Sequence, residues 1–181
     1  MQLRPATRSD LELLRRWDEQ PHVVHPGPDE DWNWETEPGN ARDWSQQLIA
    51  EERGRPIGLV RITDPAREGN CCWGAIPEGR RAIDVWIGEE ADLGKGHGMA
   101  IMRLVIELCF ADPGVSALLV DPPAGNERAH RFYERLGFRY IVRRRFGAED
   151  CCVFRLTRDE HEAGRETAGP SGPHPAEGEK P

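Results

Sequence analysis

The chain has 181 residues, 38% of them hydrophobic and 31% charged, which is typical of one globular domain of ordinary size with a buried core. The net charge of −8 at pH 7 argues against a nucleic-acid partner, which would favour a basic face. No run approaches the roughly 20 apolar residues of a membrane span, and the N-terminus lacks a secretory signal, so we expect a cytoplasmic protein with no membrane partner.

The first half of the chain predicts two helices and four strands. Ser9, followed three residues later by Glu12, indicates a capping box for the first helix. Asn40 is expected to cap a second helix, which carries apolar residues on one face and ends near Gly54. Apolar runs between turn residues predict strands at 2–4, 56–63, 71–76 and 82–88.

The second half predicts two further helices, one over 98–111 and one that begins at Asn126 and stops at Gly137. Strands are expected at 115–120, 138–145 and 151–157. Strands joined by hairpins and then through helices predict an α/β (α+β) domain with one mixed sheet covered by helices. We expect this domain over residues 1–161, and a low-complexity, disordered tail over 162–181.

Five cysteines occur in the chain, four of them as adjacent pairs at 71–72 and 151–152. An odd count without a secretory signal argues against a disulfide framework. Neighbouring residues on a strand point to opposite faces, which does not suit metal ligands. We therefore expect structural cysteines and no metal site.

The segment 93-LGKGHGM-99 lies between a predicted strand and a predicted helix. It lacks the hydroxyl residue after Gly-Lys that a Walker-type loop needs, and Met99 stands where a dinucleotide fingerprint has its third glycine. A bare backbone before a helix suits an anion, because the first helical N–H groups have no internal partners. We predict an anion site to which Lys95 adds a positive charge; a flexible turn is the alternative.

The region 84–138 resembles the GCN5-related N-acetyltransferase (GNAT) superfamily. The loop 93–98 carries the glycines of that family's Gln/Arg-x-x-Gly-x-Gly/Ala signature, with Leu93 in the leading position, and 126-NERAHRFYERLGFRY-140 resembles its second signature. The resemblance implies a mixed, mostly antiparallel sheet of about seven strands flanked by about four helices. It also implies acetyl-coenzyme A (acetyl-CoA) as co-substrate and no metal.

The same resemblance assigns roles to particular residues. The pantetheine arm would pair with the strand Val85–Ile87 and bond Asn126, and Tyr133 would lie near the sulfur. The Tyr133 hydroxyl can stabilise or protonate the departing thiolate, with a buried packing role as the alternative. Backbone N–H groups would hold the pyrophosphate, and the residues implied in cofactor binding are Val85, Trp86, Ile87, Lys95, Gly96, His97, Gly98, Met99 and Asn126.

Asp84 interrupts an otherwise apolar predicted strand just before the glycine loop. A charge at such a position is costly unless it is paired or functional. Acetyl transfer needs an amine that has lost its proton, so a carboxylate near the amine helps. Asp84 is therefore the candidate base, and an exposed position on the strand is the alternative.

No Lys or Arg occurs between Arg16 and Arg42, while the segment 29–37 holds five carboxylates together with Trp32 and Trp34. Carboxylates interleaved with aromatic rings suit a cationic ligand with apolar faces, such as an amino sugar. A solvated acidic loop is the commoner alternative. The segment therefore indicates a polycationic substrate.

The segments 22–24, 81–98 and 120–138 resemble aminoglycoside 6′-N-acetyltransferases, in the group that also resembles siderophore-lysine acyltransferases. The resemblance implies that Asp84 contacts the accepting amine and that Asp121 binds another amine of the substrate. It extends the substrate pocket to Trp32, Trp34, Trp73 and Glu78. The protein is expected to be a monomer or a homodimer.

Three functions remain open from the sequence. The first is 6′-N-acetylation of aminoglycosides, which would confer antibiotic resistance. The second is acylation of a siderophore lysine or a peptide amine, and the third is a non-catalytic module that binds acyl-CoA. Asp84 and Tyr133 favour catalysis, and the acidic segment favours a polycationic acceptor.

Overall fold

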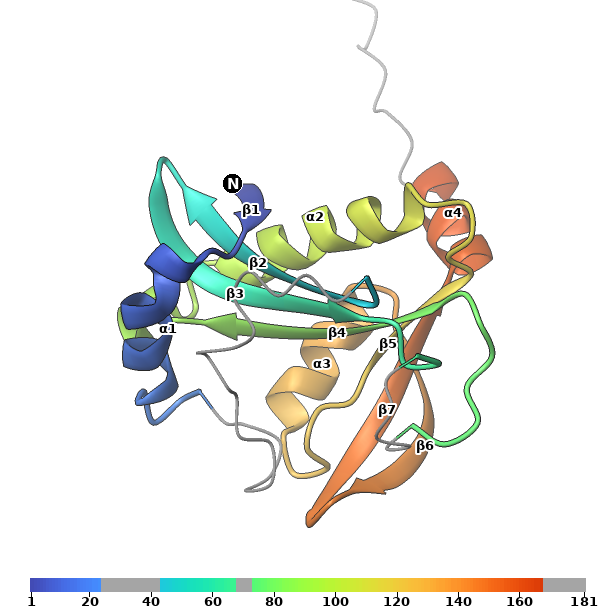
Figure 1. Ribbon diagram of the computed structural model, residues 1–181. Coiled ribbons are helices and arrows are strands. Elements are labelled where there is room, and N and C mark those ends of the chain that lie inside the picture. Colours follow the sequence, from blue (N-terminus) through green and yellow to red (C-terminus); the bar gives the residue numbers. More distant parts are fainter. Residues whose placement is uncertain (24–42, 68–72, 168–181) are drawn as a thin grey trace, which may run out of the picture.

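The computed structural model describes residues 1–23, 43–67 and 73–167 (Figure 1). Seven strands form one sheet in the order β1-β2-β3-β4-β5-β7-β6, in which only the pair β4–β5 is parallel. The strands are β1 (Gln2–Pro5), β2 (Ser45–Glu52), β3 (Arg55–Thr63), β4 (Arg80–Ile87), β5 (Ala117–Val120), β6 (Arg139–Phe146) and β7 (Glu149–Thr157). The expected mixed, mostly antiparallel sheet is confirmed.

Four α-helices accompany the sheet in the described part of the chain: α1 (Leu11–Asp18), α2 (His97–Phe110), α3 (Glu127–Arg135) and α4 (Arg158–Thr167). Leu48 and Ala50 of β2 belong to the core cluster that contains α2, whereas Ile49 packs with Leu14 and Trp17 of α1. Successive strand residues point to opposite faces, so α1 and α2 cover opposite faces of the sheet (Figure 1).

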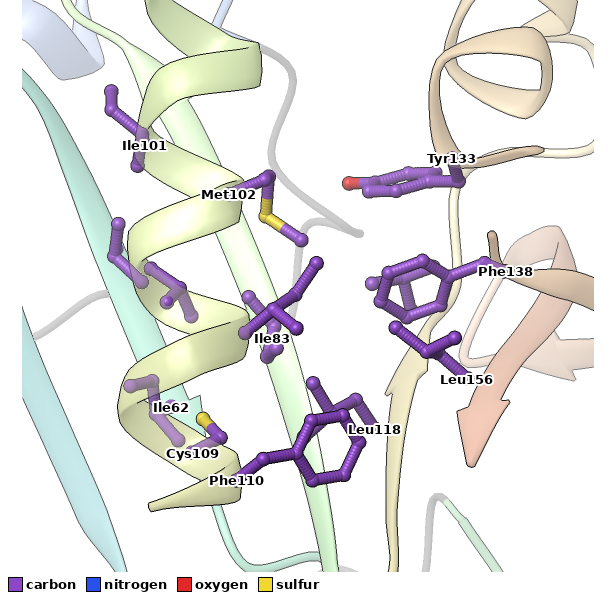
Figure 2. Packing of buried hydrophobic residues seen from close by; sticks show 14 of the residues in the cluster. Ile62, Ile83, Ile101, Met102, Cys109, Phe110, Leu118, Tyr133, Phe138 and Leu156 are labelled. Carbon is purple, nitrogen blue, oxygen red and sulfur yellow. The ribbon is translucent and has the colours of Figure 1, made fainter. Parts of the chain in front are cut away.

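The main core lies between α2 and the sheet and continues to the segment that contains Tyr133 and Phe138. Figure 2 shows Ile83 of β4 between Met102 of α2 and the aromatic rings of Tyr133 and Phe138. The core therefore ties α2, β4 and α3 together around the first half of β4. The same three elements position the site described below.

Strand β2 replaces the predicted helix after Asn40, so that prediction is wrong for residues 45–52. The apolar residues Leu48, Ile49 and Ala50 are all buried, which requires cover on both faces of a strand. The spacing of Trp44 and Leu48 suggested a helix, but residues four apart also share one face of a strand. Asn40 itself lies outside the described residues.

Three further predictions are corrected. Residues 73–76 form turns and bends and not a strand, whereas positions 71 and 72 lie outside the described residues. Thr7 and Asp10 make the capping box, with the Thr7 N–H donating to Asp10 Oδ2 over 2.8 Å, and Ser9 lies inside the 3-10 turn η1 (Arg8–Asp10). Helix α4 continues to Thr167, past the domain end predicted at 161, and Arg165 in its last turn donates to Glu107 Oε2 of α2 over 2.5 Å.

Other local features agree with the sequence. The Asn126 side chain accepts a hydrogen bond from the Ala129 N–H over 3.0 Å, which confirms the predicted cap of α3. Gly137 follows that helix with a positive φ of 91°, as its predicted stop requires. Cys109, Cys151 and Cys152 are free thiols. None of the helices in the described part of the chain combines the length and the hydropathy of a membrane span.

Candidate active site

A cavity of about 900 Å³ lies between β4, the N-terminal end of α2, α3 and the loop 121–126. Its walls combine apolar side chains, exposed backbone and several carboxylates. The predicted site residues that line it are Asp84, Val85, Trp86, Ile87, Gly96, His97, Gly98, Met99, Asp121, Asn126 and Tyr133. The fold therefore brings most of the predicted cofactor and acceptor residues to one cavity.

Strand β4 borders the cavity with one of its edges. It pairs with β3 as far as Ile87 but with β5 only over residues 80–82. The Gly88 N–H donates to Ile57 O of β3 over 2.9 Å, so strand alternation turns the N–H and C=O of Val85 away from β3. Five consecutive residues, 83–87, line the cavity, as expected where a strand presents its edge and not one face.

The glycine loop closes another side of the cavity through its backbone. Gly94 and Gly96 have positive φ values of 74° and 84°, and Gly96 is the N-cap of α2. A side chain at either position would be strained even though no heavy atom lies within 4 Å of its Cβ. The first intrahelical bond runs from Ala100 N–H to Gly96 O, so the preceding N–H groups of His97, Gly98 and Met99 have no intrahelical acceptor.

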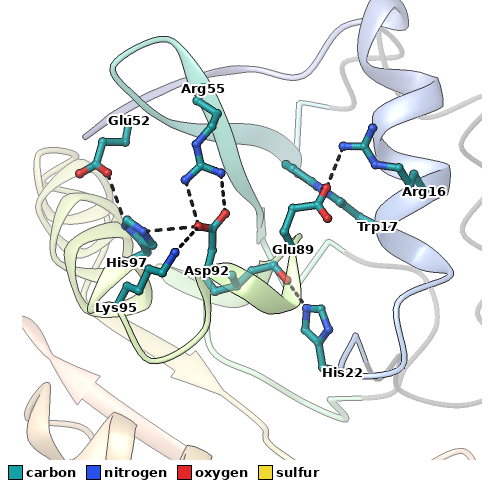
Figure 3. Close-up of polar contacts among 10 residues, drawn as sticks. Arg16, Trp17, His22, Glu52, Arg55, Glu89, Asp92, Lys95 and His97 are labelled. Atoms are coloured by element: carbon teal, nitrogen blue, oxygen red, sulfur yellow. Dashed lines mark hydrogen bonds and ion pairs between the residues drawn. The ribbon is translucent and has the colours of Figure 1, made fainter.

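A buried carboxylate holds this loop in place (Figure 3). Asp92, in the 3-10 turn η2 (Glu90–Asp92), accepts two hydrogen bonds from the Arg55 guanidinium, over 2.7 and 2.9 Å. Arg55 lowers the pKa of Asp92 below its ordinary value. Lys95 Nζ lies 3.5 Å from Asp92 Oδ1, and His97 Nε2 lies 3.9 Å from the same oxygen. The Lys95 charge thus faces Asp92, and its side chain is not among those lining the cavity.

The carboxylates of Asp84 and Asp121 approach the cavity from different elements. Asp84 lies on β4, opposite Arg61 of β3, and Asp121 directly follows β5. Both residues are half-buried, and both charges raise the pKa of the Tyr133 hydroxyl. The two predicted acceptor carboxylates and the predicted catalytic tyrosine therefore line the same cavity.

Tyr133 is only 8% exposed and belongs to the main core. Its ring makes edge contacts with Phe132 and Phe138, at centroid distances of 5.2 and 5.8 Å. Figure 2 shows the hydroxyl pointing from α3 toward Met102. Burial raises the pKa of this phenol, with smaller contributions from Asp84 and Asp121. Tyr133 is thus both a packing residue and a neutral hydroxyl that lines the cavity.

Two predicted pocket residues lie elsewhere. Trp73 is 7% exposed, makes an edge contact with the Phe146 ring at 5.0 Å, and packs with Ala82 and Val153 in a separate cluster. Glu78 is exposed, and neither residue lines the cavity. The resemblance implied both residues for the pocket, but this irregular segment packs Trp73 into a cluster with Ala82, Leu119 and Val153 instead. Trp32 and Trp34 lie outside the described residues.

Asp92, His22 and Glu149 are polar lining residues to which the sequence analysis assigned no individual role. Asp92 has its partner on the distant β2–β3 hairpin, so no local spacing identifies it. His22 was noted only as part of a resemblance; its Nε2 lies 2.8 Å from Ile87 O, at the end of β4. Glu149 stands at the start of β7, where the sequence shows only an ordinary hairpin. Within residues 1–23, 43–67 and 73–167, no group of three His, Cys, Asp or Glu is placed to hold a metal.

Three features define the class of protein: the seven-stranded sheet, the edge of β4 that β5 leaves unpaired beyond residue 82, and the helix capped by Gly96. A model of the acetyltransferase (GNAT) domain matches residues 6–146, and the chain belongs to this family of acetyltransferases. The resemblance predicted from the two signatures is therefore confirmed.

Particular relatives refine this class. The chain is 32% identical over 150 residues to proteins named aminoglycoside N(6′)-acetyltransferase type 1 from Klebsiella pneumoniae and from Serratia marcescens. Each match covers 75% of this chain and 72% of the relative. A structure of AAC(6′)-Ib in complex with ribostamycin and coenzyme A superimposes with a TM-score of 0.82 at 30% identity, covering 90% of this chain and 96% of that protein.

Proposed function

We propose that the protein transfers the acetyl group of acetyl-CoA to the 6′-amine of aminoglycoside antibiotics. The observation that carries the proposal is the single cavity, which combines an open strand edge and a helix N-terminus with Asp84, Asp121 and Tyr133. The first two features suit a thioester carrier, the two carboxylates suit a cationic acceptor, and the tyrosine hydroxyl suits the leaving sulfur. The relatives' names and their complexes with aminoglycosides and coenzyme A support the same assignment.

The cofactor side of the cavity suits the pyrophosphate and the extended pantetheine chain of acetyl-CoA. The N–H groups of residues 95–99 would hold the pyrophosphate, since the two positive-φ glycines keep side chains out of this approach. The outward N–H and C=O of Val85 would pair with the amides of the pantetheine arm, as a neighbouring strand would. Asn126 would be a further contact, although its Oδ1 already accepts from the Ala129 N–H. Acetyl-CoA would supply the acetyl group as an activated thioester.

On the acceptor side, Asp84 accepts the proton that the 6′-ammonium must lose, directly or through water. The neutral amine nitrogen then forms the new N–C bond as the C–S bond of the thioester breaks. The nitrogen loses its second proton to water in this step, which leaves the neutral amide. Asp121 binds a second ammonium group and orients the sugar ring. The amide carries no charge, so the carboxylates hold the product less strongly than the substrate at that position.

Tyr133 acts on the leaving sulfur. Because burial raises the pKa of the phenol far above the value of about 8.5 that is usual for a thiol, complete proton transfer to a thiolate is unfavourable. Its hydroxyl therefore donates a hydrogen bond to the developing negative charge and remains a phenol. The thiolate takes its final proton from solvent.

The protein would act in the cytoplasm, where acetyl-CoA is available, as a monomer or homodimer. The free thiols of Cys109, Cys151 and Cys152 are consistent with a reducing compartment.

Thiol release tests the proposal. The protein is mixed with acetyl-CoA and with kanamycin, tobramycin or a lysine derivative, and the free thiol of coenzyme A is measured. We expect release with the aminoglycosides, and mass spectrometry and NMR of the product should place the acetyl group on the 6′-nitrogen. Release with the lysine derivative alone would support a siderophore or peptide acyltransferase. Tight binding of acetyl-CoA without turnover on any amine would indicate a non-catalytic module.

A further inference from the structure

We propose that Arg55 is a positioning residue for the coenzyme: by neutralising Asp92, it leaves the charge of Lys95 available to the pyrophosphate. The proposal rests on the assignment of the cavity to acetyl-CoA and does not depend on which amine is acetylated. Arg55 begins β3, far in the sequence from both signatures, and its side chain does not line the cavity.

A buried carboxylate beside an anion site is unexpected. Asp92 is 3% exposed, lies shortly before Gly94, and lines the same cavity as the first turn of α2. An ionised carboxylate at this position repels a diphosphate, because burial reduces the screening by solvent. The charge of Asp92 must therefore be balanced if the glycine loop is to bind pyrophosphate.

Two permanently charged side chains approach Asp92 in the described part of the chain, and Arg55 is the closer one. Its guanidinium donates to both carboxylate oxygens, over 2.7 and 2.9 Å, in the paired geometry that suits a carboxylate. Lys95 Nζ lies 3.5 Å from Oδ1, at the limit of a hydrogen bond, and the Lys95 side chain is 57% exposed. Because Arg55 already satisfies the carboxylate, Lys95 can turn toward a phosphate at little cost.

The other ionisable groups of this cluster do not replace Arg55 (Figure 3). His97 Nδ1 lies 3.9 Å from Glu52 Oε2, and His97 Nε2 lies 3.9 Å from Asp92 Oδ1. Both separations are longer than a hydrogen bond. Loss of Arg55 would therefore leave Lys95 as the main counter-charge of Asp92 and would hold it away from the coenzyme.

A second arginine–carboxylate pair provides a matched control. Arg4 of β1 donates to both oxygens of Asp10, over 2.8 and 2.7 Å, and Asp10 is 6% exposed. Neither residue lines the cavity. Arg4→Gln thus also takes a guanidinium away from a buried carboxylate, but it leaves the charge at the glycine loop unchanged.

The test measures the Kd for coenzyme A by calorimetry, at a temperature where circular dichroism shows each variant to be folded. Arg55→Gln should raise this Kd about tenfold, because a charge-assisted hydrogen bond from Lys95 to the pyrophosphate is lost. Arg55→Lys should keep most of the affinity, because it retains the positive charge. Arg4→Gln should match the wild type in Kd, even though loss of a buried pair lowers its Tm.

Neutralising the carboxylate gives the sharper comparison. Asp92→Asn should bind coenzyme A at least as tightly as the wild type, although its Tm is lower. The double variant Arg55→Gln/Asp92→Asn should return the Kd to within about twofold of the wild type, because no unbalanced charge remains. A merely structural pair predicts the opposite, since each single variant would then weaken coenzyme binding and the double variant would not recover it.

Two results would overturn the proposal. One is an equal loss of coenzyme affinity in Arg55→Gln and Arg4→Gln, and the other is a double variant that binds as weakly as Arg55→Gln. A wild type that binds coenzyme A but acetylates no aminoglycoside would refute the proposed acceptor, while the coenzyme measurements still decide the role of Arg55. A wild type that does not bind coenzyme A would refute both.

Discussion

In the proposed function, the two halves of the cavity recognise their ligands by different means. The half assigned to the cofactor presents main-chain groups: the edge of β4 at Val85 and the N–H groups of 95–99. The half assigned to the acceptor presents the side chains of Asp84 and Asp121, which come from β4 and the loop after β5. The first half therefore comes from one continuous segment, and the second comes from residues far apart in the chain.

This difference has a chemical cause. A backbone site tolerates many side chains as long as its glycines keep their conformation. A site made of charged side chains on separate elements changes with each single substitution. We therefore expect substitutions in the two halves to affect different kinetic constants.

The largest effect is expected from Asp84→Asn. Loss of the base should lower kcat with kanamycin by about 10²- to 10⁴-fold at neutral pH, the usual contribution of general base catalysis. The Kd for coenzyme A, measured by calorimetry, should stay close to that of the wild type. Asp159→Asn, an exposed change on α4, serves as the control. Equal losses in kcat and in affinity for coenzyme A would show that the two halves of the cavity do not act independently.

Tyr133→Phe should lower kcat by about 10- to 100-fold, the value of one hydrogen bond to a charged group. Burial raises the pKa of Tyr133 above the ordinary value near 10, so the hydroxyl keeps its proton below that pH. The ratio of wild-type to variant kcat should therefore be constant from about pH 6 to about pH 10. A ratio that approaches one as the pH rises within this range would mean that the tyrosine ionises, contrary to our account.

Gly96→Ala should raise the Kd for coenzyme A about tenfold, because an alanine in the left-handed conformation costs roughly 1–2 kcal/mol. Binding of kanamycin alone should be unaffected. Gly54→Ala is the control for backbone strain outside the site, because Gly54 also has a positive φ, of 78°, and does not line the cavity. If both variants lose coenzyme affinity equally, strain is acting through overall stability and the loop has no special role.

The smallest effect is expected from Asp92→Asn, which should lower Tm by several degrees at neutral pH. Arg55 lowers the pKa of Asp92, so its contribution to stability is fully present above the ordinary value near 3.9 and disappears as the pH falls through the lower folded value. The Tm difference between wild type and variant should thus be constant from about pH 5 to about pH 8 and narrow below about pH 4.

Asp43→Asn is the control for this change, because Asp43 and Arg67 form an exposed ion pair that should contribute little. An equal decrease in Tm for the two variants would mean that the buried carboxylate does not stabilise the loop. The same would follow if the Tm difference between wild type and Asp92→Asn stayed constant below about pH 4.

Local sequence patterns were enough to predict the backbone of the half assigned to the cofactor. The glycines at 94, 96 and 98 and the cap at Asn126 have local conformational requirements, so they predicted a helix N-terminus and a helix start that the structure confirms. The apolar run at 82–88 also predicted a strand, and Asp84 was noticed because it is the one charged residue in that run. Prediction failed for β2, because its spacing of apolar residues fits both a helix and a strand. It also failed for Trp73, which the resemblance implied for the pocket but which packs in a separate cluster.

The partners of the charged residues could be seen only in the tertiary structure. Asp92 meets Arg55 across 37 positions, and the start of β7 meets the loop after β5 through backbone bonds that no local pattern encodes. Whether a carboxylate such as Glu149 or Asp150 faces a cavity or the solvent depends on strand register. Register is set by the packing of the whole sheet, so the acceptor side of this site appears only in the folded protein.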